Sequence, residues 1–490
     1  MFSWNVFRIS FLLTVFGILV PLKTFSSEPP SLSATEQAQE SDYSAWTGEV
    51  VEGFNFLFRT LLSGSVIQPA DSSQNPHNDF LQIPRYALKC EFRPDFSLAF
   101  RKLKLSIKPR FVETWQNWED GALKGQSEAD DDIYVNEWLV SYRLHENWFV
   151  SYGRENLQWG PSYLLSPSNP FFRDNGQSNL RQEVRGMDFV RSVWVMNPAW
   201  TLSLIDNVGE GAQTFQHGFE PTNANKAEYT AFQKYASLID SYAESENDRY
   251  AFEPTYAVKI DYTAFQKYVS LIGSYTEKDR FHLGGFGGWT VSDGLMLYTE
   301  GSLSMGTNAL YPRKIQIQPF DREFIRTLAA KEDSTGLEPI YLLGGSYTFE
   351  SGQTVVAEYV FNGTGYSRQE AESYYYYRRV ASQFYDFPYP LGDLSKLALL
   401  HTLDPKLRLL RQNYIMLQYM QSQIWEKLNL FIRYTINLDD TSSQLISNLG
   451  YDLGNHTQLF LNGNQNIGNT ETEFGSLYQY AVTLGIEYIF

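Results

Sequence analysis

The C-terminal end of the chain constrains its fold more than any other segment. Residues 480–490 read YAVTLGIEYIF, in which large apolar side chains occupy every second position and small or polar side chains lie between them. This alternation predicts a β-strand with one apolar face. Six large apolar groups on the final strand need cover, and lipid would provide it.

A strand of this kind that ends on an aromatic residue resembles the closing strand of bacterial outer-membrane β-barrels. The resemblance implies that Tyr488 and Phe490 form the membrane-insertion signal read by the barrel-insertion machinery. A soluble β-sandwich shares the period of two but rarely combines it with this length and this terminus. Aromatic residues make up 16% of the chain and glycines number 34, as aromatic girdles and tight barrel bends require.

The first residues predict export. Residues 9–22 form an apolar run after Arg8, which is too short to span a bilayer as a helix and suits a signal peptide over residues 1–26. Residues 27–40 are polar and predict a periplasmic leader. In residues 42–62 apolar side chains recur at steps of three and four, which predicts an amphipathic helix that plugs the barrel from the periplasm or lies on the membrane. We therefore expect a leader and helix over residues 27–64 and a barrel over residues 65–490.

Charge and composition exclude several classes of function. The formal charge is −17, and removal of Arg8 and Lys23 with the signal peptide gives −17 − 2 = −19, which argues against nucleic acid as a partner. The single cysteine, Cys90, rules out an intrachain disulfide. Six scattered histidines lack metal-ligand spacing and no catalytic motif occurs, so we expect no metal, no cofactor and no enzyme activity. A barrel hydrolase, with a site built from distant strands, remains an alternative.

Strand patterns continue from about Ile83 to the end of the chain. Short turns alternate with long connections, of which the longest predicted are residues 160–183, 307–338 and 363–412. Outer-membrane barrels have short periplasmic turns and long external loops. At roughly 22 residues per strand and loop, the pattern predicts an all-β transmembrane antiparallel barrel of about 18 strands, with 16 as the alternative. The expected location is the outer membrane of a Gram-negative bacterium, in contact with lipid and lipopolysaccharide.

One internal repeat interrupts this pattern. Residues 229–242 read YTAFQKYASLIDSY and residues 262–275 read YTAFQKYVSLIGSY, so that twelve of fourteen positions match. We interpret the repeated unit as one hairpin, because a duplicated hairpin adds two strands without preventing closure. A duplication inside an external loop, or a helical stripe, is the alternative.

A second resemblance is carried by residues 153–172, which read GRENLQWGPSYLLSPSNPFF. The Trp159-Gly160-Pro161 step, followed by a Leu-Ser-Asn-rich segment, resembles the capsule-assembly barrels of the Wzi type. That resemblance implies an 18-stranded barrel with a periplasmic helical portion that binds capsular polysaccharide at the cell surface, with Trp159 as a candidate ligand-binding residue. Without the resemblance, Gly160-Pro161 simply ends a strand in a turn.

Side-chain alternation also predicts which residues face the lumen. Pairing the hairpin around Glu146 sets Glu137 opposite Glu155 and aims both inward, where a cation such as Arg433, Arg143 or a bound ion would be needed between them. The same alternation aims Arg154 at lipid unless it lies above the apolar band or a bulge turns it inward. Glu137, Glu155 and Arg433 are therefore candidate lumen residues.

The predicted external loop 363–412 carries an aromatic run. Tyr374, Tyr375, Tyr376 and Tyr377 precede Arg378 and Arg379, and tyrosine rings can stack on sugars while their hydroxyls form hydrogen bonds. These six residues are candidate ligand contacts, and residues 394–403 predict a short helix over the barrel mouth. The expected function is binding or export of surface polysaccharide, such as capsule or exopolysaccharide; a passive diffusion porin for small solutes is the alternative.

Overall fold

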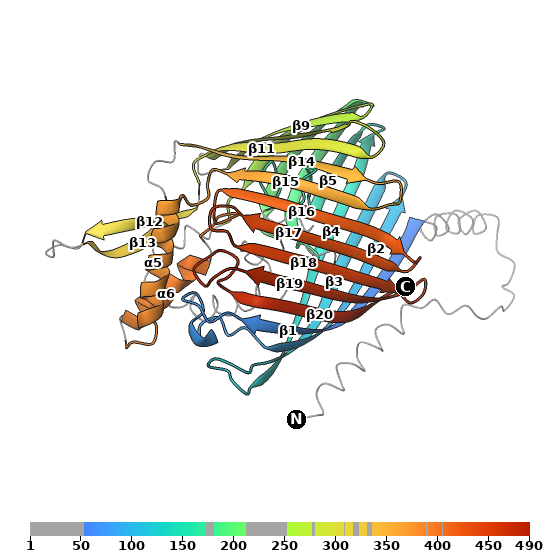
Figure 1. Ribbon diagram of the computed structural model, residues 1–490. Helices are drawn as coiled ribbons and strands as arrows, with labels where there is room; N and C mark the ends of the chain where they lie inside the picture. The colour runs from blue at the N-terminus through green and yellow to red at the C-terminus, as the bar shows by residue number, and fades with distance from the viewer. Residues whose placement is uncertain are drawn as a thin grey trace, which may run out of the picture. The chain divides into compact units, whose positions relative to one another are not determined.

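The barrel of this chain is a single closed sheet. The computed structural model describes residues 53–172, 181–211, 252–276, 280–307, 309–316, 323–330, 336–388, 391–403 and 405–490. Eighteen strands pair antiparallel with their neighbours, and β1 (Phe54–Pro69) also pairs with β20 (Tyr478–Ile489), which closes the barrel. Figure 1 shows these two strands, the first and the last, side by side. The predicted fold class and the predicted number of 18 strands are confirmed.

The other strands of the barrel follow in chain order around the sheet. They are β2 (Tyr86–Phe100), β3 (Leu103–Asn117), β4 (Ser127–His145), β5 (Trp148–Glu155), β6 (Met187–Asn197), β7 (Trp200–Gly209), β8 (Thr255–Ala264), β9 (Lys267–Thr276), β10 (Arg280–Thr290), β11 (Leu295–Met305), β14 (Leu337–Thr348), β15 (Thr354–Asn362), β16 (Asn413–Ile424), β17 (Leu428–Asn437), β18 (Ser443–Asp452) and β19 (Thr457–Ile467).

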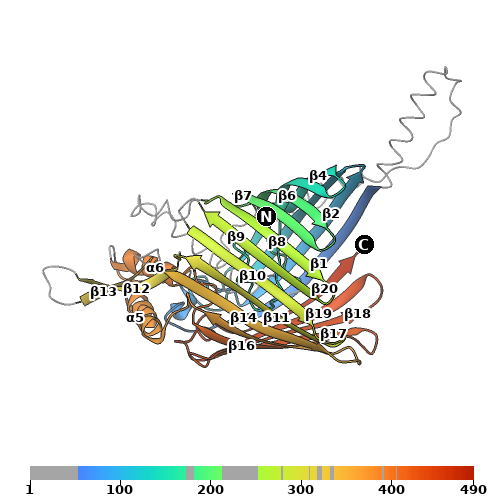
Figure 2. The ribbon, with the colours of Figure 1, turned by 90° about the horizontal axis from the view of Figure 1, so that it is seen from above.

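Five described elements lie outside the barrel sheet. A separate two-stranded sheet consists of β12 (Leu310–Gln316) and β13 (Glu323–Ala330), and the helices are η1 (Pro76–Asn78), α5 (Arg368–Phe384) and α6 (Leu391–Leu403). They all belong to connections at the end of the barrel opposite the short turns, and Figures 1 and 2 show α5, α6, β12 and β13 together at that end. Neither α5 nor α6 is long and apolar enough to cross a membrane.

The asymmetry between short turns and long connections is confirmed. At one end the turns are as short as two residues, as between β4 and β5 or between β6 and β7. At the other end β5 and β6 are joined by residues 156–186, and β15 and β16 by residues 363–412. In outer-membrane barrels the short turns face the periplasm, so the long connections of this barrel face outward.

The predicted helix over residues 42–62 is wrong where the structure describes it. From Phe54 onward the chain is strand β1, with Phe56 opposite Phe96 of β2 and Leu62 opposite Ile486 of β20. Phe54, Phe58 and Leu62 fit a helical spacing of four and also a strand period of two, which Phe56 shares. Strand pairing decides between the two, because a barrel without β1 would have two open edges. The rest of that predicted helix lies outside the described residues.

The last strand has the predicted faces. On β20 the side chains of Val482, Leu484, Ile486 and Tyr488 are exposed on the outer face. Phe490 continues the pairing, since its backbone N–H donates to the Phe58 carbonyl at 2.8 Å and its carbonyl accepts from the Phe58 N–H at 3.0 Å. The chain terminus therefore takes part in closure of the barrel. The role of Tyr488 and Phe490 as an insertion signal stays a prediction.

The outer face forms an apolar belt. Exposed leucines, valines and isoleucines cover its middle, and aromatic side chains gather toward its lower rim, among them Trp148, Trp194, Trp200, Tyr262 and Trp289. Such a belt around a closed sheet is stable only in lipid, because all backbone groups are paired within the wall and the apolar outer face avoids water. The protein is thus a bacterial outer-membrane β-barrel.

The second copy of the internal repeat forms a hairpin. Residues 262–275 cover the end of β8, the turn at Phe265 and Gln266, and most of β9. The first copy, residues 229–242, lies outside the described residues. Because β7 pairs directly with β8, the closed sheet is complete with 18 strands formed by described residues alone.

Candidate functional site

The connection between β5 and β6 folds into the barrel. Its described parts, residues 156–172 and 181–186, contact inward-facing side chains on opposite sides of the wall, on β11 and β15 and on β1 to β3. We call these two described parts, residues 156–172 and 181–186, the inserted loop. It contains the Trp159-Gly160-Pro161 step and the Leu-Ser-Asn-rich segment that the sequence singled out. A loop held inside an 18-stranded wall sets the free cross-section of the lumen.

The first anchor of the inserted loop is Glu300 on β11, which is 1% exposed. Its carboxylate accepts hydrogen bonds from the Ser166 hydroxyl at 2.5 Å, the Ser168 hydroxyl at 2.6 Å and the Ser168 backbone N–H at 3.1 Å, and also from the Ser162 hydroxyl. Hydrogen bonds to a buried charged acceptor are the strong kind. The serines of this segment are therefore an anchor rather than a surface for ligand.

Gly160 is required for this approach. Its φ of +92° belongs to the region that favours glycine, and a Cβ at this position would lie 2.3 Å from an oxygen of Glu300. Any other residue would combine backbone strain with a clash against the anchor. The glycine of the Trp-Gly-Pro step thus lets the loop backbone reach the wall.

The second anchor is Glu358 on β15. It accepts the backbone N–H groups of Tyr163 at 2.7 Å and Leu164 at 2.9 Å, and the hydroxyl of Tyr298 at 2.7 Å. Next to it Leu165 packs into a buried cluster on the inner faces of β11 and β14 to β16. That cluster includes Ile340, Leu342, Val356, Val360 and Met416. The wall that packs against Leu165 is thus largely apolar, and Glu300 and Glu358 supply its contacts to the loop.

The end of the inserted loop is held by arginines on β1 to β3. Glu183 pairs with Arg110 at 2.5 and 3.0 Å and with Arg59 at 2.9 Å, and Arg93 donates to the Arg181 carbonyl at 2.9 Å. Burial by itself would raise the pKa of Glu183, but the hydrogen bond and charges of the arginines bring that pKa below its usual value. The carboxylate therefore stays charged and holds the loop at neutral pH.

The accessible part of the lumen lies against the charged wall on β2 to β6. Lys108 and Glu137 pair at 3.0 Å with side chains that are 33% and 26% exposed, and Arg185 pairs with Asp132 at 2.8 Å while both remain partly exposed. By contrast, the inward side chains of β11 and β14 to β16 are mostly buried under the loop. The loop therefore covers the inward faces of β11 and β14 to β16, and its end covers Arg93 and Arg110 on β2 and β3. The Lys108–Glu137 and Arg185–Asp132 pairs remain partly exposed.

The candidate lumen residues lie on three different parts of the wall. Glu137 on β4 and Glu155 on β5 each have their own cation: Lys108 pairs with Glu137 at 3.0 Å, and Arg191 pairs with Glu155 at 2.8 Å. The single cation that the sequence suggested between the two carboxylates is therefore replaced by a separate cation for each.

Arg154 and Arg433, the two arginines considered with these carboxylates, have other partners. Arg154 lies opposite Trp138 as expected, but its guanidinium pairs with Asp188 at 2.9 Å and donates to the Val135 carbonyl at 3.0 Å. Arg433 is fully buried and donates to Gln418 at 2.8 Å. Neither arginine lies between Glu137 and Glu155.

Trp159 lies at the start of the inserted loop and not at the cell surface. Its ring meets Phe171 edge to face with centroids 5.8 Å apart, and the Lys259 ammonium lies 5.8 Å from the ring centroid. Its backbone carbonyl accepts the Ser166 hydroxyl at 3.0 Å. The Trp-Gly-Pro step therefore shapes the loop inside the barrel.

The aromatic run is part of helix α5, and most of it is buried. Tyr374 is 2% exposed and donates to the Thr402 carbonyl of α6 at 2.6 Å, and Tyr375 packs beside it. Tyr377 packs against buried apolar side chains of α5 and α6. The side chain of Tyr376, by contrast, is 48% exposed. The run therefore lies in the predicted external connection, but as part of a helix whose spacing turns only part of it outward.

The two arginines after the run differ in the same way. Arg378 is 1% exposed and donates to Ser73 at 2.9 Å, Gln74 at 3.0 Å and the Thr470 carbonyl at 2.6 Å. Arg379 is exposed and pairs with Glu471 at 3.0 Å. Arg378 thus ties α5 to two neighbouring connections at the barrel mouth.

The helix predicted over residues 394–403 is confirmed as α6, which begins at Leu391. It packs with α5 on Phe80, Leu81 and Ile83 of the β1–β2 connection and on the inward-facing ends of β1 and β20. The two helices therefore cover the barrel mouth on the side where the sheet closes. Sequence reasoning did not identify Glu300, Glu358, Glu183 or Glu473, although acids at inward positions of otherwise apolar strands were a usable signal for the first two.

The described residues contain no group of three or more histidine, cysteine, aspartate or glutamate side chains arranged to hold a metal ion. The charged groups of the lumen are instead arranged as ion pairs and loop anchors. Such an arrangement can narrow, orient and screen a passing solute.

Comparison with known proteins adds likenesses of fold only. No family model matches the sequence. No curated protein matches it. Solved structures similar to the barrel include Pseudomonas aeruginosa OprD, with a TM-score of 0.45 and 10% identity over 89% of this chain and 95% of that one.

Two further structures show the same range of similarity. Acinetobacter baumannii OccAB1 has a TM-score of 0.48 and 8% identity over 89% of this chain and 96% of that chain, and a mutant of the Rh. blastica porin has a TM-score of 0.40 and 8% identity over 89% and 100%. At such scores the likeness assigns no function to this chain. The resemblance of residues 153–172 to Wzi-type proteins receives no support from these comparisons.

Proposed function

We propose that this protein is a passive channel of the outer membrane for small hydrophilic solutes. The observation that carries the proposal is the position of the inserted loop, which is anchored on Glu300 and Glu358 and leaves the ion pairs Lys108–Glu137 and Arg185–Asp132 partly exposed inside the barrel. A wall of half-exposed ion pairs is a favourable surface for water and polar solutes and an unfavourable one for apolar solutes.

A role in binding surface polysaccharide has weaker support. Of the aromatic run, Tyr374 and Tyr375 are buried where helices α5 and α6 cover the barrel mouth, and Trp159 lies inside the barrel. Tyr376 and Arg379 remain exposed, but they do not form a stacking platform. The structure offers its polar contacts to solutes in the lumen rather than to a polymer at the surface.

The test is conductance of the purified full-length protein in planar bilayers, combined with swelling of liposomes in neutral solutes of increasing mass. We expect discrete conductance steps and swelling rates that fall as solute mass increases. Protein that is folded, as judged by heat-modifiable migration, but shows neither conductance nor swelling would overturn the proposal.

A charge variant tests whether solutes pass the charged wall. Lys108→Glu places a second carboxylate beside Glu137, so the reversal potential in a salt gradient should shift toward cations. Glu113→Gln, which changes a charge on the outer face of β3, is the control and should leave the reversal potential unchanged. Equal reversal potentials in wild type and Lys108→Glu would place the conducting path elsewhere.

A further inference from the structure

The outer wall of the barrel is hollowed across β4 to β10. A groove of about 880 Å³ extends from Val140 on β4 to Phe281 on β10. Its rim consists of exposed aromatic side chains of the outer face, namely Tyr142, Tyr152, Tyr256, Tyr275 and Phe281. Because the wall stands in lipid, whatever fills this groove is a membrane component or a protein within the membrane.

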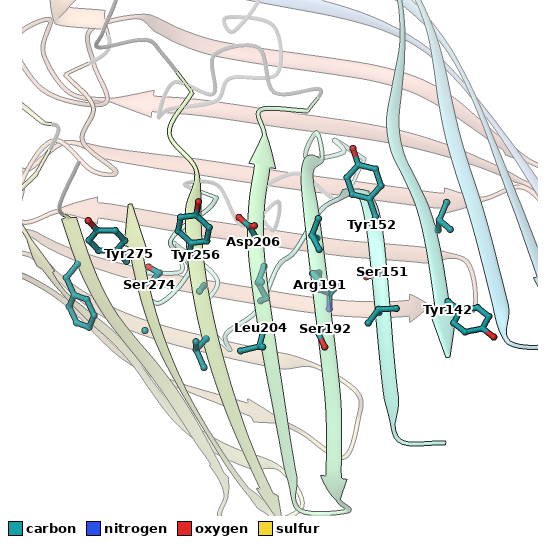
Figure 3. A pocket seen from close by; sticks show the side chains of 18 residues that line it. Tyr142, Ser151, Tyr152, Arg191, Ser192, Leu204, Asp206, Tyr256, Ser274 and Tyr275 are labelled. Atoms are coloured by element: carbon teal, nitrogen blue, oxygen red, sulfur yellow. The ribbon is translucent and has the colours of Figure 1, made fainter. Parts of the chain in front are cut away.

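A single carboxylate lies within the aromatic row of the groove. Strand pairing places Asp206 of β7 opposite Val190 of β6 on one side and opposite Tyr256 of β8 on the other, and Tyr256 is opposite Tyr275 of β9. Figure 3 shows Asp206 beside Tyr256, with Leu204 and Ser192 below it. An acid therefore occupies a position that the pattern of the outer face reserves for an apolar residue.

Asp206 has no protein partner among the residues that the structure describes, which give it neither a hydrogen bond nor an ion pair. It lies six residues beyond Trp200 of the lower rim, which at about 3.3 Å per residue and a tilt of about 40° is roughly 15 Å higher in the wall. That height lies within an apolar band of about 25 Å, near its outward side. A charged carboxylate there is stabilised by a cationic group from outside the chain.

Below Asp206 the floor of the groove is formed by small and aliphatic residues. Ser192, Leu204, Val258 and Gly273 lie here, and a Cβ added to Gly273 would meet no atom within 4 Å. The groove therefore has an open apolar floor, with an acid and phenolic hydroxyls above it. A molecule with an apolar chain and a small cationic head matches that order of groups.

We propose that this groove binds a lipid whose phosphorylated head group carries a primary ammonium. The ammonium pairs with Asp206, the phosphate accepts hydrogen bonds from hydroxyls of the tyrosine rim, and an acyl chain lies along the floor past Gly273. A second copy of this chain is a poorer occupant, because a two-fold contact at the groove would bring two Asp206 carboxylates together. A lipid phosphate held to Asp206 through a divalent cation is also a poorer occupant, since one carboxylate supplies few of the oxygen ligands that such a cation needs.

The test is lipid binding to the full-length, delipidated protein by native mass spectrometry. Phosphatidylethanolamine and phosphatidylglycerol of identical acyl chains are titrated separately, so that only the head group differs. We expect the ammonium lipid to bind the wild type about fivefold more tightly than the glycerol lipid, a ratio that corresponds to about 1 kcal/mol. Asp206→Asn should remove this preference, and Gly273→Phe should weaken binding of both lipids because it fills the floor.

Two matched variants separate the groove from the rest of the wall. Glu113→Gln removes an outward-facing acid from β3, and Gly64→Phe adds a ring to β1 at another glycine whose Cβ would meet no atom within 4 Å. Both should bind lipid as the wild type does, and all four variants should still show heat-modifiable migration.

Three results would overturn the proposal. Equal binding of the two lipids by the wild type would show that the ammonium group is not recognised. Unchanged lipid binding in Gly273→Phe would show that the lipid does not occupy the groove. A dimer that dissociates on Gly273→Phe substitution would assign the groove to a second copy of the chain. Because conductance plays no part in these readouts, failure here leaves the proposed channel function untouched.

Discussion

The anchoring of the inserted loop leads to a quantitative prediction about conductance. Glu300→Ala removes the acceptor of four hydrogen bonds from the loop. The serine hydroxyls can turn to water, but the backbone N–H of Ser168 is left buried without an acceptor, and a charged acceptor bond is worth about 1.5–3 kcal/mol. We therefore expect the docked position of the loop to lose about 3 kcal/mol, which shifts its docking equilibrium on the order of 100-fold.

Removal of both anchors should release this part of the loop. Glu358→Ala leaves two further backbone N–H groups, those of Tyr163 and Leu164, without their acceptor. In single-channel recordings Glu300→Ala should show brief openings to a higher conductance level, and the double variant should stay at that level. Liposome swelling should then extend to larger solutes.

The control for this prediction is Glu137→Ala, which removes a lumen carboxylate that pairs with Lys108 and does not hold the loop. Its ion preference should change while its conductance level stays close to that of the wild type. If the folded double variant kept the wild-type conductance and the wild-type limit on solute size, the reasoning that Glu300 and Glu358 hold a constriction would be refuted.

Three other expectations concern the mouth and the chain terminus. Burial raises the pKa of Glu473 in the β19–β20 connection to about 8, so its contribution to stability is present at acidic pH and is lost as the pH rises from about 4.5 to 8. Urea unfolding should therefore show that the wild type is less stable at pH 9 than at pH 6. The stability of a Glu473→Gln variant should depend less on pH. Tyr374→Ser should lower stability in the same assay by about 3 kcal/mol, against less than about 0.5 kcal/mol for exposed Tyr376→Ser. Deletion of Phe490, which pairs with Phe58, should reduce the amount of folded protein in the outer membrane, as measured by heat-modifiable migration.

Local pattern was enough to predict the wall of this protein. Alternation on β20 and on β17 follows directly from which residues face lipid, and short turns between alternating segments set the strand count. The helix predicted over residues 42–62 failed because Phe54, Phe58 and Leu62 fit two periods at once. Only pairing with β2 and β20, which are distant in sequence, selects the strand.

The site was beyond the reach of local pattern, because its contacts join residues more than a hundred positions apart. Ser166 and Ser168 bond to Glu300, and Glu183 bonds to Arg59. No period in the sequence relates such residues, so the segment around Trp159 could be noticed as unusual but not located inside the barrel. The sequence by itself determined a membrane barrel, since the alternation of apolar and polar side chains is a local response to lipid on one face and water on the other. Tertiary structure alone decided which side chains of the lumen stay accessible, because buried carboxylates bind a distant loop only after the barrel has closed around it.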